Sequence, residues 1–150
     1  MFRGAAKITL DDKGRMVMPT RQREQIVADA QGKVVVTVDR DQCLLIYPQP
    51  AWVPVEQKLM SLPTLHPQAR RLQRLMVGYA TELELDGHGR ILLPSELREF
   101  ARIERTAMLI GQFTRWELWN DALWNERRDE WMKSEGAEQG LHAQLDSLTF

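Results

Sequence analysis

The chain has 150 residues, of which 43% are hydrophobic and 27% are charged, with a net charge of −1. This composition is typical of a globular protein and excludes a disordered one. No apolar run approaches the ~20 residues of a membrane span, and the first residues lack the apolar core of a secretory signal. A single cysteine, Cys43, excludes an internal disulfide framework, and its apolar neighbours predict that it is buried.

The small net charge hides an asymmetry along the chain. Residues 1–75 carry 12 basic and 7 acidic side chains, whereas residues 76–150 carry 8 and 14. The basic half could face a polyanion, and the acidic half could face solvent or the basic half of a neighbouring copy. The alternative is that the charges only solvate the surface.

The first half is predicted to alternate short strands, tight turns and one helix. In chain order we expect a strand over 7–10, a turn over 11–14, a strand over 16–18 and a helix over 21–30. A strand over 33–38, a turn over 39–42 and a strand over 43–47 should follow. Gly14 suits a turn position with positive φ, and Asp11 can accept hydrogen bonds from backbone N–H groups further along the turn. Thr20 suits the N-cap of the helix, and Ile26 and Val27 are expected to face inward.

The middle of the chain is predicted to be helical and interrupted by prolines. Five of the seven prolines fall within 48–67, which indicates broken helix and loop rather than sheet. A helix is expected over 67–79. The second half then repeats the first. We expect strands over 83–85 and 90–93, a helix over 95–103 capped by Ser95, strands over 107–113 and 115–119, and a last helix over 121–133. Residues 134–150 are acidic and weakly patterned, and we expect them to fray.

The two halves share one motif. The segment 10–20, LDDKGRMVMPT, returns 75 residues later as 85–95, LDGHGRILLPS. Leu, Asp, Gly, Arg and Pro are identical at matched positions, and Arg23 is matched by Arg98 a few residues further on. The chain is therefore a duplicated module, and because one unit is small we expect the two units to share a core.

The repeated motif carries a resemblance to known proteins. The motif consists of Asp, then Gly-Arg, three apolar residues, Pro, and Thr or Ser before a short helix. It resembles the SpoVT–AbrB type of DNA-binding domain. Two such units after the opening Met1–Gly4 resemble the MraZ family of transcriptional regulators, over residues 1 to about 125. The resemblance implies an α+β fold in which two swapped-hairpin units form a pseudo-symmetric barrel flanked by helices. It also implies repression of the promoter of the protein's own division and cell-wall cluster, and assembly into rings.

We therefore expect four segments. They are a first SpoVT–AbrB-like unit over 1–54, an inter-unit helical linker over 55–80, a second SpoVT–AbrB-like unit over 81–125, and a C-terminal helix with a tail over 126–150.

The residues themselves favour DNA binding by the first turn. Arg15 leaves the turn directly after Gly14, a two-stranded ribbon fits the major groove, and the guanidinium can donate two hydrogen bonds to guanine or to a phosphate. The basic residues near it in sequence could contact phosphates. The candidate DNA contacts are Arg15, Lys13, Arg90, Arg3, Lys7 and Arg21, with Arg23 as a further basic neighbour. The candidate turn-structuring residues are Asp11, Gly14, Asp86 and Gly89.

Alternatives exist for both arginines. An ion pair between Asp11 and Arg15 could serve only to lock the turn, or Asp11 could aim an arginine that then reads DNA. The second copy is less basic, with His88, Gly87 and Glu96 in place of Lys13, Asp12 and Arg21. Arg90 could contact DNA directly, or it could be an architectural partner of Asp86 or Glu84.

Other chemistry finds no support in the sequence. The turn is too short for a calcium loop, the three histidines lack metal-ligand spacing, and neither a phosphate loop nor a nucleophile elbow is present. We expect no enzyme activity, metal or cofactor. The spacing of Trp116, Trp119, Trp124 and Trp131 favours core or subunit contacts over a stacking platform.

The sequence thus predicts a cytoplasmic, nucleoid-associated regulator that binds double-stranded promoter DNA with repeated boxes as a homo-oligomer. The alternative is an assembly or partner-binding scaffold without direct DNA recognition.

Overall fold

The computed structural model describes residues 1–134 and Leu148. The first repeat contains β1 (Ala5–Thr9), β2 (Arg15–Val17), α1 (Thr20–Ala30), β3 (Lys33–Val38), β4 (Leu44–Pro48) and α2 (Gln49–Met60). After α3 (Pro67–Met76), the second repeat contains β5 (Thr81–Glu84), β6 (Arg90–Leu92), α4 (Ser95–Phe100), β7 (Thr106–Gln112), β8 (Arg115–Asn120) and α5 (Asp121–Ser134). The predicted order of strands and helices and the α+β class are confirmed. The tail predicted to fray lies outside the described residues, apart from Ser134, which ends α5, and Leu148.

The predicted helix caps are wrong. Thr20 and Ser95 are the first residues of α1 and α4, and Pro19 and Pro94 occupy the capping positions without a side-chain cap. Pro19 and Pro94 are extended, with ψ of 148° and 149°, so the helical conformation begins only at the next residue. The Thr20 hydroxyl instead accepts a hydrogen bond from Nη2 of Arg23 at 3.0 Å.

Two predictions about helix faces and ends are wrong in part, although Ile26 faces inward as predicted. Helix α1 buries Ile26 and Ala30, which are one turn apart, whereas Val27 falls outside this stripe and is 56% exposed. Helix α4 stops at Phe100 rather than at Ile103, because Arg102 adopts a left-handed conformation with φ of 55°. That turn brings Ile103 into the core.

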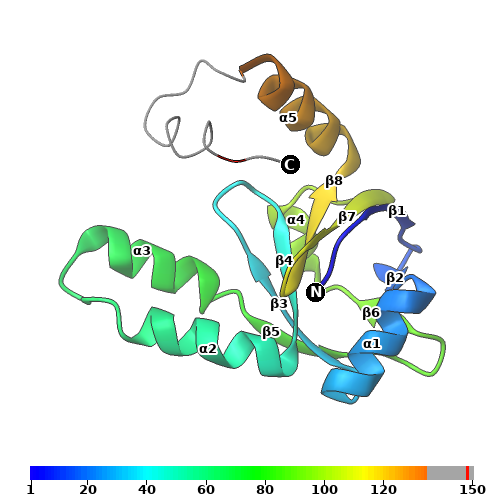
Figure 1. Cartoon of the computed structure of the whole chain (residues 1–150), viewed down its shortest axis with the longest axis horizontal. Coiled ribbons are helices and arrows are strands. Elements are labelled where there is room, and N and C mark those ends of the chain that lie inside the picture. Colours follow the sequence, from blue (N-terminus) through cyan, green and yellow to red (C-terminus); the bar gives the residue numbers. More distant parts are fainter. Residues whose placement is uncertain (135–147, 149–150) are drawn as a thin grey trace.

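The two repeats exchange strands. The described strands form an antiparallel six-stranded sheet in the order β1-β7-β8-β4-β3-β5 (Figure 1). Strand β1 of the first repeat therefore pairs with β7 of the second, and β5 of the second pairs with β3 of the first. Strands β4 and β8 meet at the centre. This reciprocal pairing is the swapped-hairpin arrangement that the resemblance implied.

Strands β2 and β6 form a separate two-stranded ribbon. Their register places Arg15 opposite Leu92, Met16 opposite Ile91 and Val17 opposite Arg90. Because the motif recurs after 75 residues, Met16 and Ile91 are equivalent positions, and the local two-fold axis passes between them. Both of these side chains are fully buried, with 0% exposure.

Both faces of the sheet are covered. One face packs against the inner side of the ribbon and against α1 and α4, through a core that contains Met16, Ile26, Ile91 and Leu97. The other face packs against α2, α3 and α5, through a second core that contains the buried Cys43. Burial raises the pKa of the Cys43 thiol well above its usual value. Among the described residues, no helix combines the length and apolar character needed to cross a membrane.

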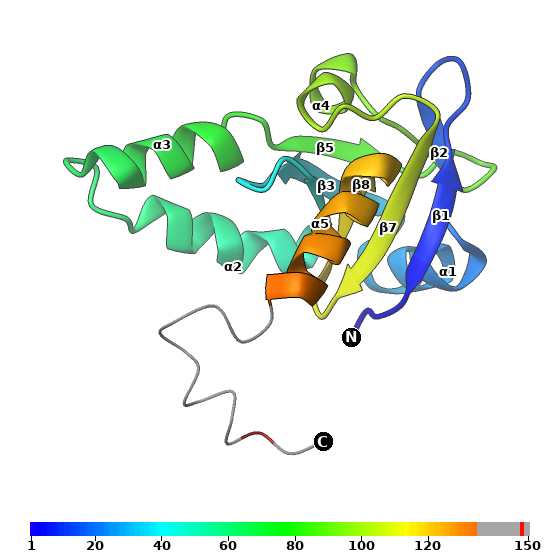
Figure 2. The same ribbon diagram turned by 90° about the horizontal axis from the view of Figure 1, so that it is seen from above.

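Helices α2 and α3 form an arm. In both views they lie side by side and project away from the sheet (Figures 1 and 2). The side-chain amide of Gln73 on α3 donates a hydrogen bond to the backbone oxygen of Leu59 on α2 at 2.8 Å. The proline-rich segment thus contains a regular helix, α2, with Pro50 near its start and Pro54 inside it.

Substitutions on the two faces of the ribbon should differ sharply in their effect on the stability of the protein. We expect Ile91→Ala to lower the free energy of unfolding by ~2–5 kcal/mol, because it opens a cavity beneath the ribbon. Leu92→Ala, one residue further on, should change it by no more than about 0.5 kcal/mol, because that side chain is 54% exposed. Urea denaturation of the two variants measures the difference. Equal losses would contradict the assignment of an inner and an outer face.

Candidate nucleic-acid interface

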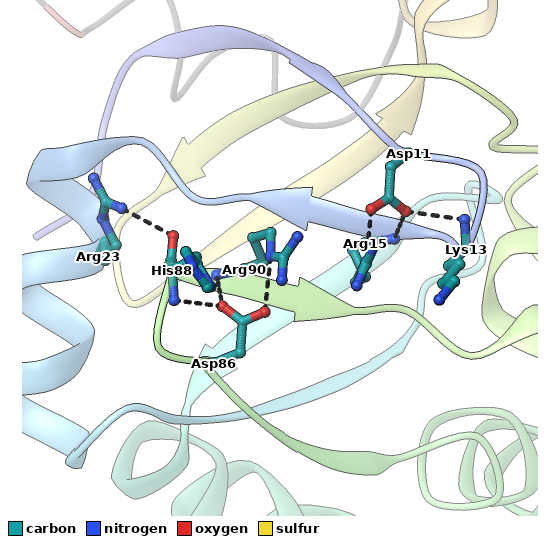
Figure 3. A network of polar contacts seen from close by, with 7 residues as sticks. All are labelled: Asp11, Lys13, Arg15, Arg23, Asp86, His88 and Arg90. Atoms are coloured by element: carbon teal, nitrogen blue, oxygen red, sulfur yellow. Dashed lines mark hydrogen bonds and ion pairs between the residues drawn. The ribbon is translucent and has the colours of Figure 1, made fainter.

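In the first turn, one aspartate organises the backbone and the following arginine. Oδ1 of Asp11 accepts hydrogen bonds from the backbone N–H groups of Lys13 and Arg15, each at 2.9 Å (Figure 3). Oδ2 accepts a hydrogen bond from Nε of Arg15 at 2.6 Å. The carboxylate therefore closes the turn with one oxygen and fixes the guanidinium with the other.

The second turn repeats this geometry. Oδ1 of Asp86 accepts hydrogen bonds from the backbone N–H groups of His88 and Arg90 at 2.8 and 2.9 Å, and Oδ2 accepts one from Nε of Arg90 at 2.8 Å (Figure 3). The exchange of lysine for histidine leaves the turn intact, because the hydrogen bond at that position comes from the backbone. The motif is thus duplicated in its hydrogen bonds as well as in its letters.

Both aspartates are stabilised in the charged form. The backbone N–H of Arg15 is the largest cause of a lowered pKa at Asp11, and the backbone N–H of Arg90 lowers the pKa of Asp86 to about 2. Both carboxylates are therefore ionised at neutral pH and pair with their arginines. These pairs are solvent-exposed, and exposed ion pairs contribute little to stability.

The two arginines keep their outer nitrogens free. Of the side-chain nitrogens of Arg15 and Arg90, only Nε donates to the protein among the described residues. The side chains are 31% and 28% exposed. Because alternate residues of a strand face opposite sides, and Met16 and Ile91 face the core, both arginines lie on the outer face of the ribbon. The free Nη atoms can act as a planar pair of donors there.

Each turn is held in place by the helix of the other repeat. Gly14 and Gly89 have φ of +84° and +73°, a region that favours glycine. The side chain of Arg98 on α4 lies over Gly14 and donates to the backbone oxygen of Leu93 at 3.1 Å. Arg23 on α1 lies over Gly89, and its Nη1 donates to the backbone oxygen of His88 at 3.3 Å (Figure 3). Arg23, considered above as a phosphate contact, thus supports the turn of the other repeat.

The remaining candidates are scattered. Lys7 on β1 forms an ion pair with Asp121 of α5 at 3.2 Å. Arg3 lies at the opposite end of β1 from the turn, where its backbone packs against Gly111. Arg21 is exposed in the first turn of α1. The structure therefore brings Lys13, Arg15 and Arg90 together on the ribbon and its turns, and places Lys7 and Arg3 elsewhere on β1.

One basic residue near the first turn comes from the second half of the chain. Nη2 of Arg105 lies 3.5 Å from a carboxylate oxygen of Asp12, and the backbone oxygen of Arg105 accepts a hydrogen bond from Leu10. Sequence reasoning missed Arg105, because only strand exchange brings it to this turn. For the same reason the basic and acidic halves of the sequence do not form separate bodies.

The tryptophans belong to the packing of the molecule. Trp116 and Trp119 are buried, and Trp119, Trp124 and Trp131 contact one another edge to face with ring centroids 5.6–6.0 Å apart. The prediction that alternation and helical spacing mark core residues is confirmed for Trp116 and Trp119.

The fold and the turns define a class: proteins built from two interlocked swapped-hairpin repeats, each presenting one aspartate-anchored arginine. Comparison with known proteins agrees with this class. The family model "MraZ protein, putative antitoxin-like" matches residues 1–75 and again 76–145. The chain is similar to proteins named transcriptional regulator MraZ from Thioalkalivibrio sulfidiphilus (53% identity over 149 residues, 99% of each chain), Methylococcus capsulatus (45% over 152, 100% of each) and Pseudomonas aeruginosa (50% over 126, 83% of each). The chain belongs to the MraZ family.

Two glycines of the second turn should respond differently to substitution. We expect Gly89→Ala to lower the free energy of unfolding by ~1–2 kcal/mol, because a left-handed φ is unfavourable for alanine, and the added Cβ also collides with Arg23. Gly87→Ala is the matched control, since a Cβ there meets open space. Thermal unfolding followed by circular dichroism measures both variants. If Gly89→Ala is as stable as Gly87→Ala, the turn does not require the left-handed conformation.

Proposed function

We propose that this protein is a sequence-specific, DNA-binding transcriptional regulator that reads double-stranded DNA with the outer face of the β2–β6 ribbon. The observation that carries the proposal is the pair of aspartate-anchored arginines, Arg15 and Arg90, whose outer nitrogens are free on one face. The relatives are named transcriptional regulators, which supports the regulatory role. A family named for regulation also favours a binding protein over an enzyme.

The geometry suits guanine. Guanine presents two acceptors, O6 and N7, in the major groove, and the two Nη atoms of an arginine match them. With Nε held by Asp11, the guanidinium of Arg15 loses less rotational freedom when it binds, because its plane is already fixed. A two-stranded ribbon is narrow enough for a major groove about 12 Å wide. The ion pair and the reading of bases are therefore compatible roles for the same side chain.

The same reasoning extends to Arg90. The sequence left open whether Arg90 contacts DNA or pairs with Asp86. Its Nε pairs with Asp86 while its outer nitrogens remain free, and the ribbon places it on the same face as Arg15. We therefore include Arg90 among the direct DNA contacts.

Phosphate contacts would come from the basic residues around the turns. Lys13 and Arg105 flank the first turn, and Arg21 follows β2 on α1. Among the sequence candidates, Lys7 and Arg3 have the weakest geometric support, since Lys7 is paired with Asp121 and Arg3 lies at the far end of β1. Affinity should fall with added salt as these cations displace counterions.

Substitution of Arg15 tests the proposed function. We expect Arg15→Ala to lose specific binding at a cost of ~1–3 kcal/mol per site, with a nearly unchanged melting temperature. Arg15→Lys should keep the salt dependence but lose discrimination between specific and scrambled DNA, because lysine has the charge without the planar fork. Fluorescence anisotropy with both DNA duplexes, over a range of salt concentrations, measures these effects.

Arg70→Ala, an exposed arginine on α3, serves as the control and should bind as the parent does. If Arg15→Ala binds the specific duplex as tightly as the parent, Arg15 only locks its turn. The assembly scaffold without direct DNA recognition would then be the better account.

We further propose that the protein acts in the cytoplasm at the nucleoid, as a ring-shaped homo-oligomer that represses its own division and cell-wall gene cluster. The opposite charges of the two sequence halves do not favour head-to-tail assembly into a ring, because the two halves are interleaved in the fold. The support is the small contact area: each chain presents one short ribbon, which is little for the ~10⁻⁸ M affinity of specific regulators. Linking several ribbons makes the second contact intramolecular and raises avidity.

Box number therefore tests assembly. We expect the protein to be larger than a dimer and to bind DNA with several boxes at regular spacing at least ~100-fold more tightly than DNA with one box. Light scattering gives the oligomeric state, and titration of one-box and multi-box duplexes gives the affinity ratio. A monomer with equal affinity for both duplexes would refute the ring.

A further inference from the structure

We propose that Val17 and Leu92 make the ribbon selective for thymine, through the C5-methyl group, beside each guanine that an arginine reads. This inference rests on the proposed function, namely that the outer face of the ribbon meets the major groove. Val17 and Leu92 are 50% and 54% exposed on that face. Neither side chain is needed for the core beneath the ribbon, which Met16 and Ile91 fill from the inner face.

The register interleaves charge and apolar surface. Arg15 lies opposite Leu92, and Val17 lies opposite Arg90, so each arginine has an apolar neighbour both across the ribbon and two residues along its own strand. Directly opposite Cβ atoms in an antiparallel pair are ~4.5–5.5 Å apart. Successive base pairs are ~3.4 Å apart along DNA. When Arg15 reaches a guanine, Leu92 from the other repeat is therefore within one or two base pairs of it, and Val17 stands in the same relation to Arg90.

The chemistry of the groove identifies the ligand. Among the groups that DNA presents in the major groove, the C5-methyl of thymine is the apolar one, whereas the other groups are hydrogen-bond donors or acceptors. An apolar side chain held beside a guanine-reading arginine desolvates polar groups of the wrong base without replacing their hydrogen bonds. Next to thymine, the same side chain buries a methyl group instead.

Both repeats carry an exposed aliphatic residue at this position of the ribbon. Val17 and Leu92 occupy matched positions in the two repeats, so both copies place an exposed aliphatic residue after the arginine and the buried residue. The surrounding surface of each turn is charged or polar. An exposed aliphatic pair between two arginines suits a mixed apolar and hydrogen-bonding surface such as the edge of a guanine and thymine step.

The experiment removes the methyl groups without changing the sequence. A binding duplex is first selected from a random-sequence library with the full-length chain, and is then prepared with thymine or with uracil, which lacks the C5-methyl. We expect the parent protein to bind the uracil duplex more weakly, by about fourfold for each methyl group contacted. Anisotropy titrations of both duplexes give a thymine-to-uracil affinity ratio for each protein.

Substitutions then identify the residues that discriminate thymine from uracil. Val17→Ala and Leu92→Ala should each lower the ratio, and the double variant should bring it close to one. Val27→Ala, which removes a valine of similar exposure on α1, is the matched control and should keep the parent ratio. Because both duplexes are titrated against the same protein sample, the ratio does not depend on the fraction of protein that is folded.

The outcomes separate this inference from the proposed function. A parent ratio of one, with Arg15 still essential for binding, overturns the thymine contact and leaves the arginines as the readers. A ratio that Val17→Ala and Leu92→Ala leave unchanged also overturns it, because the discrimination then arises in the DNA. Failure of the parent to select any duplex overturns both proposals.

Discussion

The pairing of β2 with β6 is the interaction on which the rest of the molecule depends. The ribbon covers one face of the sheet with Met16 and Ile91, and both residues are excluded from solvent. Hydrogen bonds from the backbone N–H of Met18 to Gly89 and of Leu93 to Gly14, at 3.1 and 3.0 Å, tie each strand to the turn of the other repeat. Neither repeat can make this ribbon alone, so the core, the turns and the outer face of the ribbon form together.

The short motif satisfies several constraints at once. Its aspartate closes the turn and holds the arginine, and its glycine accepts the left-handed backbone beneath an arginine of the other repeat. Its three apolar residues alternate outward and inward, and its proline leads into a helix. The exposed ion pair contributes little to stability, whereas its geometry fixes a donor edge toward solvent. Duplication of that pair is therefore better explained by recognition than by folding.

Local patterns predicted the local structure, and the long-range pairing had to come from elsewhere. Alternation and turn residues located the strands, and the acceptor capacity of Asp11 predicted its backbone hydrogen bonds. The partner strand of β1 lies about 100 residues further along the chain, and that of β5 lies about 50 residues earlier. Periodicity carries no information about such partners; only the family resemblance implied the exchange. Hence the roles of Arg23 and Arg98 and the approach of Arg105 to Asp12 were missed. The matched spacing of Arg23 and Arg98 was a visible signal, but it did not say which turn each would cover.

The two ends of the ribbon are related by a local two-fold axis, yet they are chemically unequal. Lys13 and the Asp12–Arg105 pair flank the first turn, whereas the second turn carries Gly87 and His88. A fully symmetric ribbon would bind a box equally well in either orientation. Under the proposed function, unequal ends would present different side chains to the two halves of an asymmetric box, so one orientation of the chain along the DNA would be preferred. In the ring that we propose, chains related by rotation would all point the same way around it, which would suit boxes repeated in one direction rather than inverted pairs.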